Sequence, residues 1–173
     1  MPVESLEDPR RTDPPYLDGE RAALEAWLEY HRATLLLKVD GLTDDQRRAR
    51  PVPTSLLSLH GLVRHMAEVE RNWFARVLDG QDAPGGLYWT EAHPDGELEL
   101  LDGAVWDDDL ATWHHWCDVS REIAARHELD DTGRRRGEPV SLRWIHLHMI
   151  EEYARHNGHA DLIRELVGGS VGE

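Results

Sequence analysis

The segment from Ser141 to Val167 limits the possible folds of this chain more than any other feature, because it is the longest run with helical periodicity. It reads SLRWIHLHMIEEYARHNGHADLIRELV, with Ser141 as a suitable N-cap and with Gly168 and Gly169 as the stop. At 1.5 Å per residue, such a helix is about 40 Å long. That length lets one helix run along an entire helical bundle.

Three earlier segments also carry apolar residues at helical spacing. The first begins at Asp18 and ends at Gly41, the second runs from Ser58 to Gly80, and the third starts near Asp108. The apolar stripes that we expect to face the core are Ala23, Trp27, Tyr30, Thr34 and Leu37, then Leu59, Leu62, Met66, Val69, Trp73, Phe74 and Val77, and then Leu110, Trp113, Cys117, Ile123 and Ala124. Because no segment shows the alternation of a strand, the sequence predicts an all-α chain folded as a four-helix bundle.

The remaining segments connect or precede these helices. Residues 1–17 are expected to form an extended arm, and residues 18–168 a single helical domain. A short helical turn is expected at residues 43–50. Residues 80–107 form a long loop between the second and third helices, and loops of this length in compact domains are often functional. Residues 130–138, which include three consecutive arginines, are expected to be a polar connection.

The charge balance excludes several classes of partner. The 34 acidic and 19 basic residues give the 173-residue chain a formal net charge of −15, which repels nucleic acids and anionic membranes. No stretch has the apolar core of a signal peptide or the roughly 20 apolar residues of a membrane span. The single cysteine, Cys117, cannot form an internal disulfide, and we expect a buried thiol. These features predict a cytoplasmic protein.

The 11 histidines are concentrated on the two segments with the clearest helical pattern. His148, Glu152 and His156 are four residues apart, so a helix places them on one face. Glu152 and His156 can therefore bind one metal ion, and His65, beside the apolar stripe of the second helix, is the best placed third ligand. Two imidazoles and one carboxylate leave an open coordination position, which is typical of catalytic sites. Zinc is the metal expected first, while nickel, iron and manganese remain open.

Each of these residues also has a simpler interpretation. A Glu and His pair four residues apart is common as a surface ion pair. His148 is either a core or supporting histidine or a candidate catalytic residue, and His159 should flank the site. We expect five other histidines to be solvated: His60, His93, His114, His115 and His127.

The seven tryptophans are the second unusual feature of the composition. Trp27, Trp73 and Trp144 lie on expected helices and are interpreted as core residues. Trp89 and Trp106 belong to the long loop and could instead wall a pocket over the open metal position.

The segments SLRWIHLHMIEEYARHNGHADLIRE and SLLSLHGLVRHMAEVERNWF resemble the DinB-like superfamily, in particular its actinobacterial branch of mycothiol-dependent transferases. The likeness extends from about residue 8 to residue 168 and includes PRRTDPP and LLLKVDGLTDDQ. It implies a four-helix bundle in which His65, Glu152 and His156 occupy the metal-binding positions. Many relatives have histidine in place of Glu152, and the set found here is similar to that of mycothiol-dependent maleylpyruvate isomerase.

The resemblance also implies mycothiol as a cosubstrate. The expected function is a metal-dependent thiol S-transferase that acts on small electrophiles in detoxification, because a metal with an open position can bind a thiol as its thiolate. Two alternatives remain, a metal-dependent hydrolase or isomerase of a small substrate and a non-catalytic metal-binding stress protein. The expected partners are a small thiol and an electrophile, with a homodimer possible because bundles of this superfamily often pair.

Overall fold

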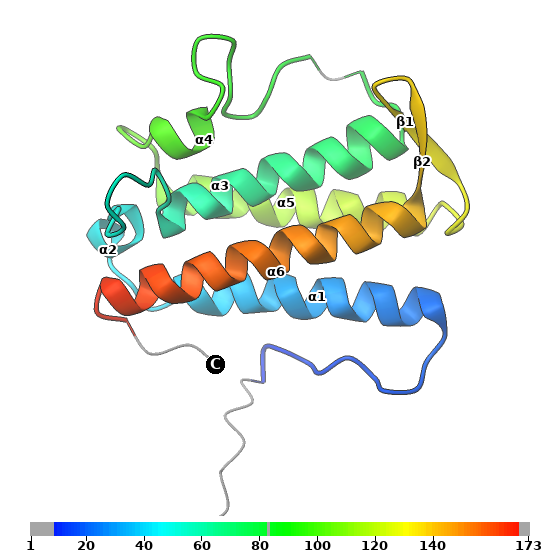
Figure 1. The fold of residues 1–173 in the computed structure, drawn as a ribbon, viewed down its shortest axis with the longest axis horizontal. Coiled ribbons are helices and arrows are strands. Elements are labelled where there is room, and N and C mark those ends of the chain that lie inside the picture. Colours follow the sequence, from blue (N-terminus) through cyan, green and yellow to red (C-terminus); the bar gives the residue numbers. More distant parts are fainter. Residues whose placement is uncertain (1–8, 83, 170–173) are drawn as a thin grey trace, which may run out of the picture.

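The protein is mostly helical in the computed structural model, which describes residues 9–82 and 84–169 (Figure 1). The long helical segments are α1 (Glu20–Val39), α3 (Leu59–Glu70) with its continuation η1 (Arg71–Leu78), α5 (Trp106–Ala124) and α6 (Leu142–Leu166). Two short helices, α2 (Asp44–Arg48) and α4 (Gly96–Glu99), and the strands β1 (Thr132–Arg135) and β2 (Glu138–Ser141) complete the described elements. The expected all-α class is therefore confirmed except for one short hairpin.

The long segments enclose one apolar core. α1 packs mainly against α6, and α3 packs mainly against α5, while α3 also contacts α6. The N-terminal arm predicted for residues 1–17 lies partly outside the described residues, and residues 9–19 contain no helix or strand. None of the described helices is both long enough and apolar enough to cross a membrane.

The core face of α1 differs from the predicted stripe. Leu28 and Leu35 are buried, whereas Trp27, which we expected in the core, is 47% exposed. Of the five residues in the predicted stripe, only Thr34 is buried. Adjacent helical positions point about 100° apart, so most of the predicted stripe lies beside the buried face. The buried row includes Arg32, whose guanidinium pairs with the buried Glu70. Because this buried row contains the charged Arg32, apolar spacing alone did not identify it as the core face of α1.

The second predicted helix is not a single α-helix. α3 begins after Ser58, whose side chain accepts a hydrogen bond from the Gly61 amide, but its hydrogen bonding changes from Arg71 onward. Asp79 N donates to Phe74 O at 3.0 Å, five residues earlier, as in a π-helix. The wider turns bury six of the eight residues, namely Arg71, Trp73, Phe74, Ala75, Val77 and Leu78. Apolar spacing alone does not distinguish this segment from an α-helix that is buried on several sides.

The polar connection predicted at residues 130–138 contains a β-hairpin, which the sequence interpretation missed. β1 and β2 pair antiparallel, with Thr132 opposite Ser141 and Arg135 opposite Glu138. Arg136 and Gly137 form the turn, and both have positive φ angles, of 52° and 89°. Thr132 is the only β-branched residue of TGRR, and the strand has no aromatic residue, so pairing with β2 and packing on η1 determine this structure.

Gly133 fixes the hairpin against η1, and its substitution should be costly. A Cβ atom at Gly133 would overlap the backbone of Val77 and Leu78, so we expect Gly133→Ala to lower the free energy of unfolding by about 2 kcal/mol. Gly158 is the matched control, because it lies on the exposed side of α6 with no atom within 4 Å of an added Cβ. Gly158→Ala should stabilise the protein by about 0.5–1 kcal/mol. Urea unfolding checks both values, and equal effects would contradict this account of the hairpin.

A buried polar network joins the long helices. Arg32 Nε and Nη2 donate to the two oxygens of Glu70 at 2.8 and 2.7 Å, and the Tyr153 hydroxyl donates to Glu70 Oε1 at 2.7 Å. Trp113 Nε1 in turn donates to the Tyr153 hydroxyl at 2.9 Å. Cys117 is 1% exposed beside this network, as expected, and burial raises the pKa of its thiol. The thiol is therefore expected to stay protonated at neutral pH.

Candidate metal site

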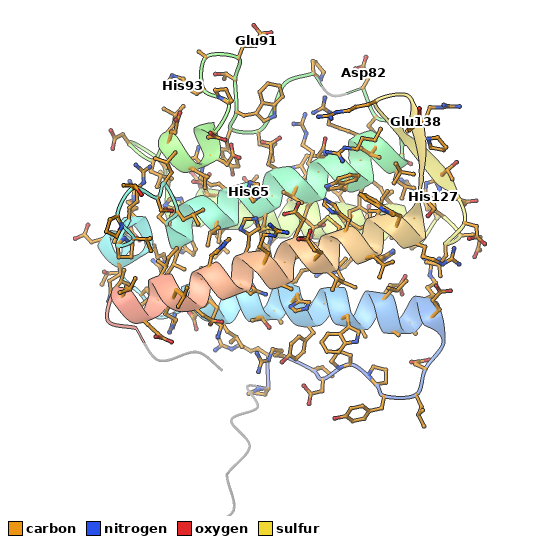
Figure 2. All side chains as sticks on the ribbon, in the orientation of Figure 1. His65, Asp82, Glu91, His93, His127 and Glu138 are labelled. Carbon is orange, nitrogen blue, oxygen red and sulfur yellow. The ribbon has the colours of Figure 1, made fainter. Side chains whose placement is uncertain are left out.

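His65 of α3 and the pair Glu152 and His156 of α6 converge in the middle of the molecule. One donor atom from each of the three side chains lies within 4.8 Å of the other two. The rings of His65 and His156 are 4.7 Å apart between centroids, and His156 Nε2 lies 3.4 Å from Glu152 Oε2. Figure 2 shows His65 near the centre of α3, where this helix faces α6. The structure thus brings together the three residues that the sequence analysis selected.

The electrostatics of this cluster suit a cation. The hydrogen bond with His156 is the main cause that lowers the pKa of Glu152, burial opposes it, and the charges of His148, His156 and His65 lower the pKa further. Glu152 is therefore ionised at neutral pH. The side chains of His65, Glu152 and His156 are 26%, 22% and 13% exposed, so a small molecule can reach them. Two imidazoles and one carboxylate match the ligands of zinc and similar divalent metals.

Glu97, on α4 inside the long loop, is a site residue that the sequence analysis missed. Its Oε1 lies 3.2 Å from His65 Nδ1, and its side chain is 10% exposed. Burial alone would raise the pKa of Glu97, but the hydrogen bond with His65 is the first of the opposing causes that lower it. A carboxylate at one ring nitrogen orients a histidine and fixes its tautomer, which leaves Nε2 as the donor atom. Nothing in the spacing of the acidic loop residues distinguishes Glu97 from its neighbours.

The long loop is held near the site by buried contacts with α3. Glu68 Oε2 accepts hydrogen bonds from the Leu87 and Tyr88 amides at 2.6 and 3.1 Å. The Arg64 guanidinium lies 4.2 Å from the centroid of the Tyr88 ring and donates to the Leu100 carbonyl at 2.5 Å. Gly96 packs so closely on the Tyr88 carbonyl that a Cβ atom would overlap it. These contacts place α4, and with it Glu97, against His65.

His148 lies next to Glu152 and not in the core. Its Nε2 is 3.2 Å from Glu152 Oε1, and its Nδ1 is 3.7 Å from Glu151 Oε2. The His148 ring stacks on Trp144 at 5.0 Å and meets the edge of Trp73 at 4.4 Å between centroids. These two tryptophans and His148 form an aromatic surface beside the candidate metal site.

His159 flanks the site, and Trp144 lies outside the core. His159 Nδ1 lies 3.4 Å from His156 Nδ1, and burial, followed by the charge of His156, lowers the pKa of His159. Trp73 is buried as predicted, but Trp144 is 45% exposed, so its assignment to the core was wrong. Its exposed ring extends the aromatic surface toward solvent.

Two further expectations fail at the other end of α3. His60 was expected to be solvated, but it is fully buried, with Nε2 2.7 Å from Asp109 Oδ2. Its ring meets the edge of Trp106 at 5.3 Å between centroids. Trp106 is itself buried, so it belongs to the core and cannot wall an open pocket. Trp89 is half-buried and packs on Gly86 within its own loop.

The other histidines lie away from the cluster. His93, His114 and His115 are exposed, as expected, whereas His127 is half-buried between Asp79 and Asp131. Figure 2 shows His127 near the hairpin end of the molecule, well separated from His65. His127 therefore offers a control position for substitutions at the site.

Comparison with known proteins gives one family. The sequence profile of the family described as mycothiol-S-transferase matches residues 23–169, which include every residue of the cluster and Glu97. No curated protein matches the chain. The match confirms the resemblance to DinB-like mycothiol transferases that the sequence motifs indicated.

Proposed function

Because the chain belongs to the mycothiol-S-transferase family, we propose that it joins mycothiol through its sulfur to a small electrophile, using a divalent metal held by His65, Glu152 and His156. The observation that carries this proposal is the convergence of three metal-binding side chains from α3 and α6 in an accessible position. The four long helical segments would then be the four-helix bundle that the DinB-like resemblance implies. Zinc is the preferred metal because its usual ligands are imidazole and carboxylate groups.

A metal in this position would bind a thiol as its thiolate and so supply a nucleophile at neutral pH. The protein side chains would orient the metal ligands and set the charge of the site. Glu97 contacts the His65 ring at Nδ1, which leaves Nε2 available to the metal, and Glu152 contributes a single negative charge. With one carboxylate among its three ligands, a divalent metal and these ligands together would carry a net positive charge, which favours an anionic sulfur.

His148 is the candidate proton acceptor. Its Nε2 contacts Glu152, while its Nδ1 side faces Glu151 and the side chain is 21% exposed. We propose that His148 accepts the thiol proton and passes it to solvent. The exposed ring of Trp144 would hold the apolar part of the electrophile and limit the access of water.

A conjugation assay tests the proposal. Zinc-loaded protein should accelerate the reaction of mycothiol with 1-chloro-2,4-dinitrobenzene above the uncatalysed rate, and free cysteine at the same concentration should be a much poorer substrate. A rate with mycothiol equal to the uncatalysed rate would reject the transferase. Hydrolysis of small amides or esters by the same zinc-loaded sample would then favour the water-using hydrolase.

Glu97 should contribute to metal affinity through His65. We expect Glu97→Gln to weaken binding about 10-fold, because the amide orients the ring less strongly than the carboxylate. Glu99→Gln is the matched control, since Glu99 lies on the same short helix and contacts the exposed His93. Competition with a chromophoric chelator measures both affinities. An unchanged affinity in Glu97→Gln would show that the carboxylate does not support the site.

A further inference from the structure

Four arginines line a single surface groove between η1 and the hairpin. Arg76 belongs to η1, and Arg134, Arg135 and Arg136 are the consecutive arginines of the hairpin. We call this the arginine groove; its volume is about 520 Å³. The other lining residues are Asn72, Val77, Gly80, Gln81 and Asp82. Such a concentration of positive charge is unexpected in a chain with a formal net charge of −15.

The positive charge of the arginine groove is not neutralised locally. Within residues 9–82 and 84–169, no carboxylate forms an ion pair with Arg76, Arg134 or Arg136. Among the residues that the structure describes, Arg134 donates only to the Gly137 carbonyl, at 2.9 Å, and Asp82 is the single acidic residue of the lining. Other exposed arginines of this protein do pair with carboxylates, as Arg143 does with Glu20. Guanidinium groups without carboxylate partners are suited to bind an anion with several acceptor oxygens.

The backbone at the tip of the hairpin favours a different residue from the one present. Arg136 has a φ of 52°, and two-residue hairpin turns of this type prefer asparagine, aspartate or glycine there. An arginine in the left-handed region is strained, and such strain is found most often at functional positions. The close packing of Gly133 on η1 holds the turn beside Arg76.

Consecutive contacts connect the arginine groove to the candidate metal site. The Arg135 guanidinium carbon lies 4.5 Å from the centroid of the Trp73 ring. Trp73 contacts His148, and His148 contacts Glu152. Figure 1 shows the hairpin where η1 ends and α6 begins, next to the α3 and α6 helices that carry the site. Two aromatic side chains, Trp73 and His148, therefore separate Arg135 of the groove from Glu152 of the candidate metal site.

We propose that the arginine groove binds the anionic group of the electrophilic substrate, so that the enzyme selects small electrophiles with a sulfonate, carboxylate or phosphate group. That the bound electrophile reacts at the candidate metal site rests on the proposed function. Anion binding by the arginine groove does not rest on it. In the transfer, the sulfur of the thiol forms a bond to carbon, the leaving group departs with its electron pair, and the thiol proton goes to solvent.

Two electrophiles that differ in charge test the selection. Thiolates displace chloride from both 4-chloro-3-nitrobenzenesulfonate and the neutral 4-chloro-3-nitrobenzenesulfonamide, and a sulfonate is a poor metal ligand. After division by the uncatalysed rates, zinc-loaded protein should prefer the sulfonate about 10-fold in kcat/KM. The preference should decrease as salt is added.

The variant Arg134→Gln with Arg136→Asn separates binding from folding. It should lose most of the preference for the sulfonate, while its Tm should stay equal or rise by about 1–2 °C because asparagine suits the turn. A purely structural role of Arg136 predicts a lower Tm instead. The control Arg10→Gln with Arg121→Gln removes the same charge from arginines paired with Asp40 and Glu29, and it should keep the preference.

Calorimetry with unreactive analogues measures anion binding by the arginine groove without turnover. Zinc-loaded protein should bind 3-nitrobenzenesulfonate more tightly than 3-nitrobenzenesulfonamide, and the Arg134 and Arg136 variant should not. If this result holds while conjugation is absent, the arginine groove is supported and the proposed function fails. Equal binding of the two analogues by the wild type, or an unchanged difference in the variant, would overturn the inference.

Discussion

Replacement of both Glu152 and His156 by alanine should leave the purified protein with almost no divalent metal, compared with about one ion per chain in the wild type. A single remaining imidazole, His65, cannot hold the ion at micromolar concentrations. Conjugation of mycothiol should fall by at least about 100-fold, since the metal supplies several kcal/mol of stabilisation. His65→Ala, which removes the proposed ligand on α3, should cause the same loss of metal and of conjugation. The measurements are metal analysis by mass spectrometry and the conjugation rate.

His127→Ala is the control for these ligand variants. His127 lies between Asp79 and Asp131, at the hairpin end of the molecule. Its removal should leave the metal content and the conjugation rate unchanged. Full metal occupancy in the double variant of Glu152 and His156 would disprove the assignment of these ligands.

The largest loss of stability is expected from Glu70→Ala. The change leaves the Arg32 guanidinium, which is 4% exposed, without its bidentate partner, and it removes the acceptor of the Tyr153 hydroxyl. Breaking a buried ion pair from one side costs about 3–5 kcal/mol. The pair of Arg32 with Glu29 at 2.6 Å should keep the loss at the lower end. Urea unfolding measures the change in the free energy of unfolding.

Glu25→Ala is the matched control for this buried pair. Glu25 forms a surface ion pair with Arg21 on the same helix as Arg32, and its loss should change the free energy of unfolding by less than about 0.5 kcal/mol. A loss below about 1 kcal/mol in Glu70→Ala would mean that water or other groups compensate Arg32. Because Tyr153 follows Glu152 directly, the same network also holds the part of α6 that carries Glu152 against α3.

The candidate site could be predicted because its residues lie where helix geometry is regular. α6 is an uninterrupted α-helix, so the spacing of Glu152 and His156 translates directly into a common face. His65 precedes the change to π-helical hydrogen bonding at Arg71, so its position beside the apolar stripe of α3 was also reliable. The fold class followed from the same periodicity.

The features that the sequence did not predict depend on contacts between segments that are distant along the chain. Glu97 reaches His65 because part-buried hydrogen bonds hold the long loop against α3. His60 is buried by its pairing with Asp109 on α5, which no local pattern signals. The hairpin of residues 132–141 likewise forms where Gly133 permits close packing on η1. In each case a tertiary partner, and not the local sequence, determines the environment of the residue.

Cobalt spectroscopy tests the central claim, that this site activates the thiol of mycothiol, most directly. The sample is cobalt-loaded Cys117→Ser protein, in which the chain's own thiol cannot give a signal. Addition of mycothiol at neutral pH should produce a sulfur-to-metal charge-transfer band, because a coordinated thiol is deprotonated well below its free pKa of about 8.5. S-methylated mycothiol, which cannot form a thiolate, should give no band. A fully loaded site that shows no band and no change in Tm with mycothiol would contradict the account.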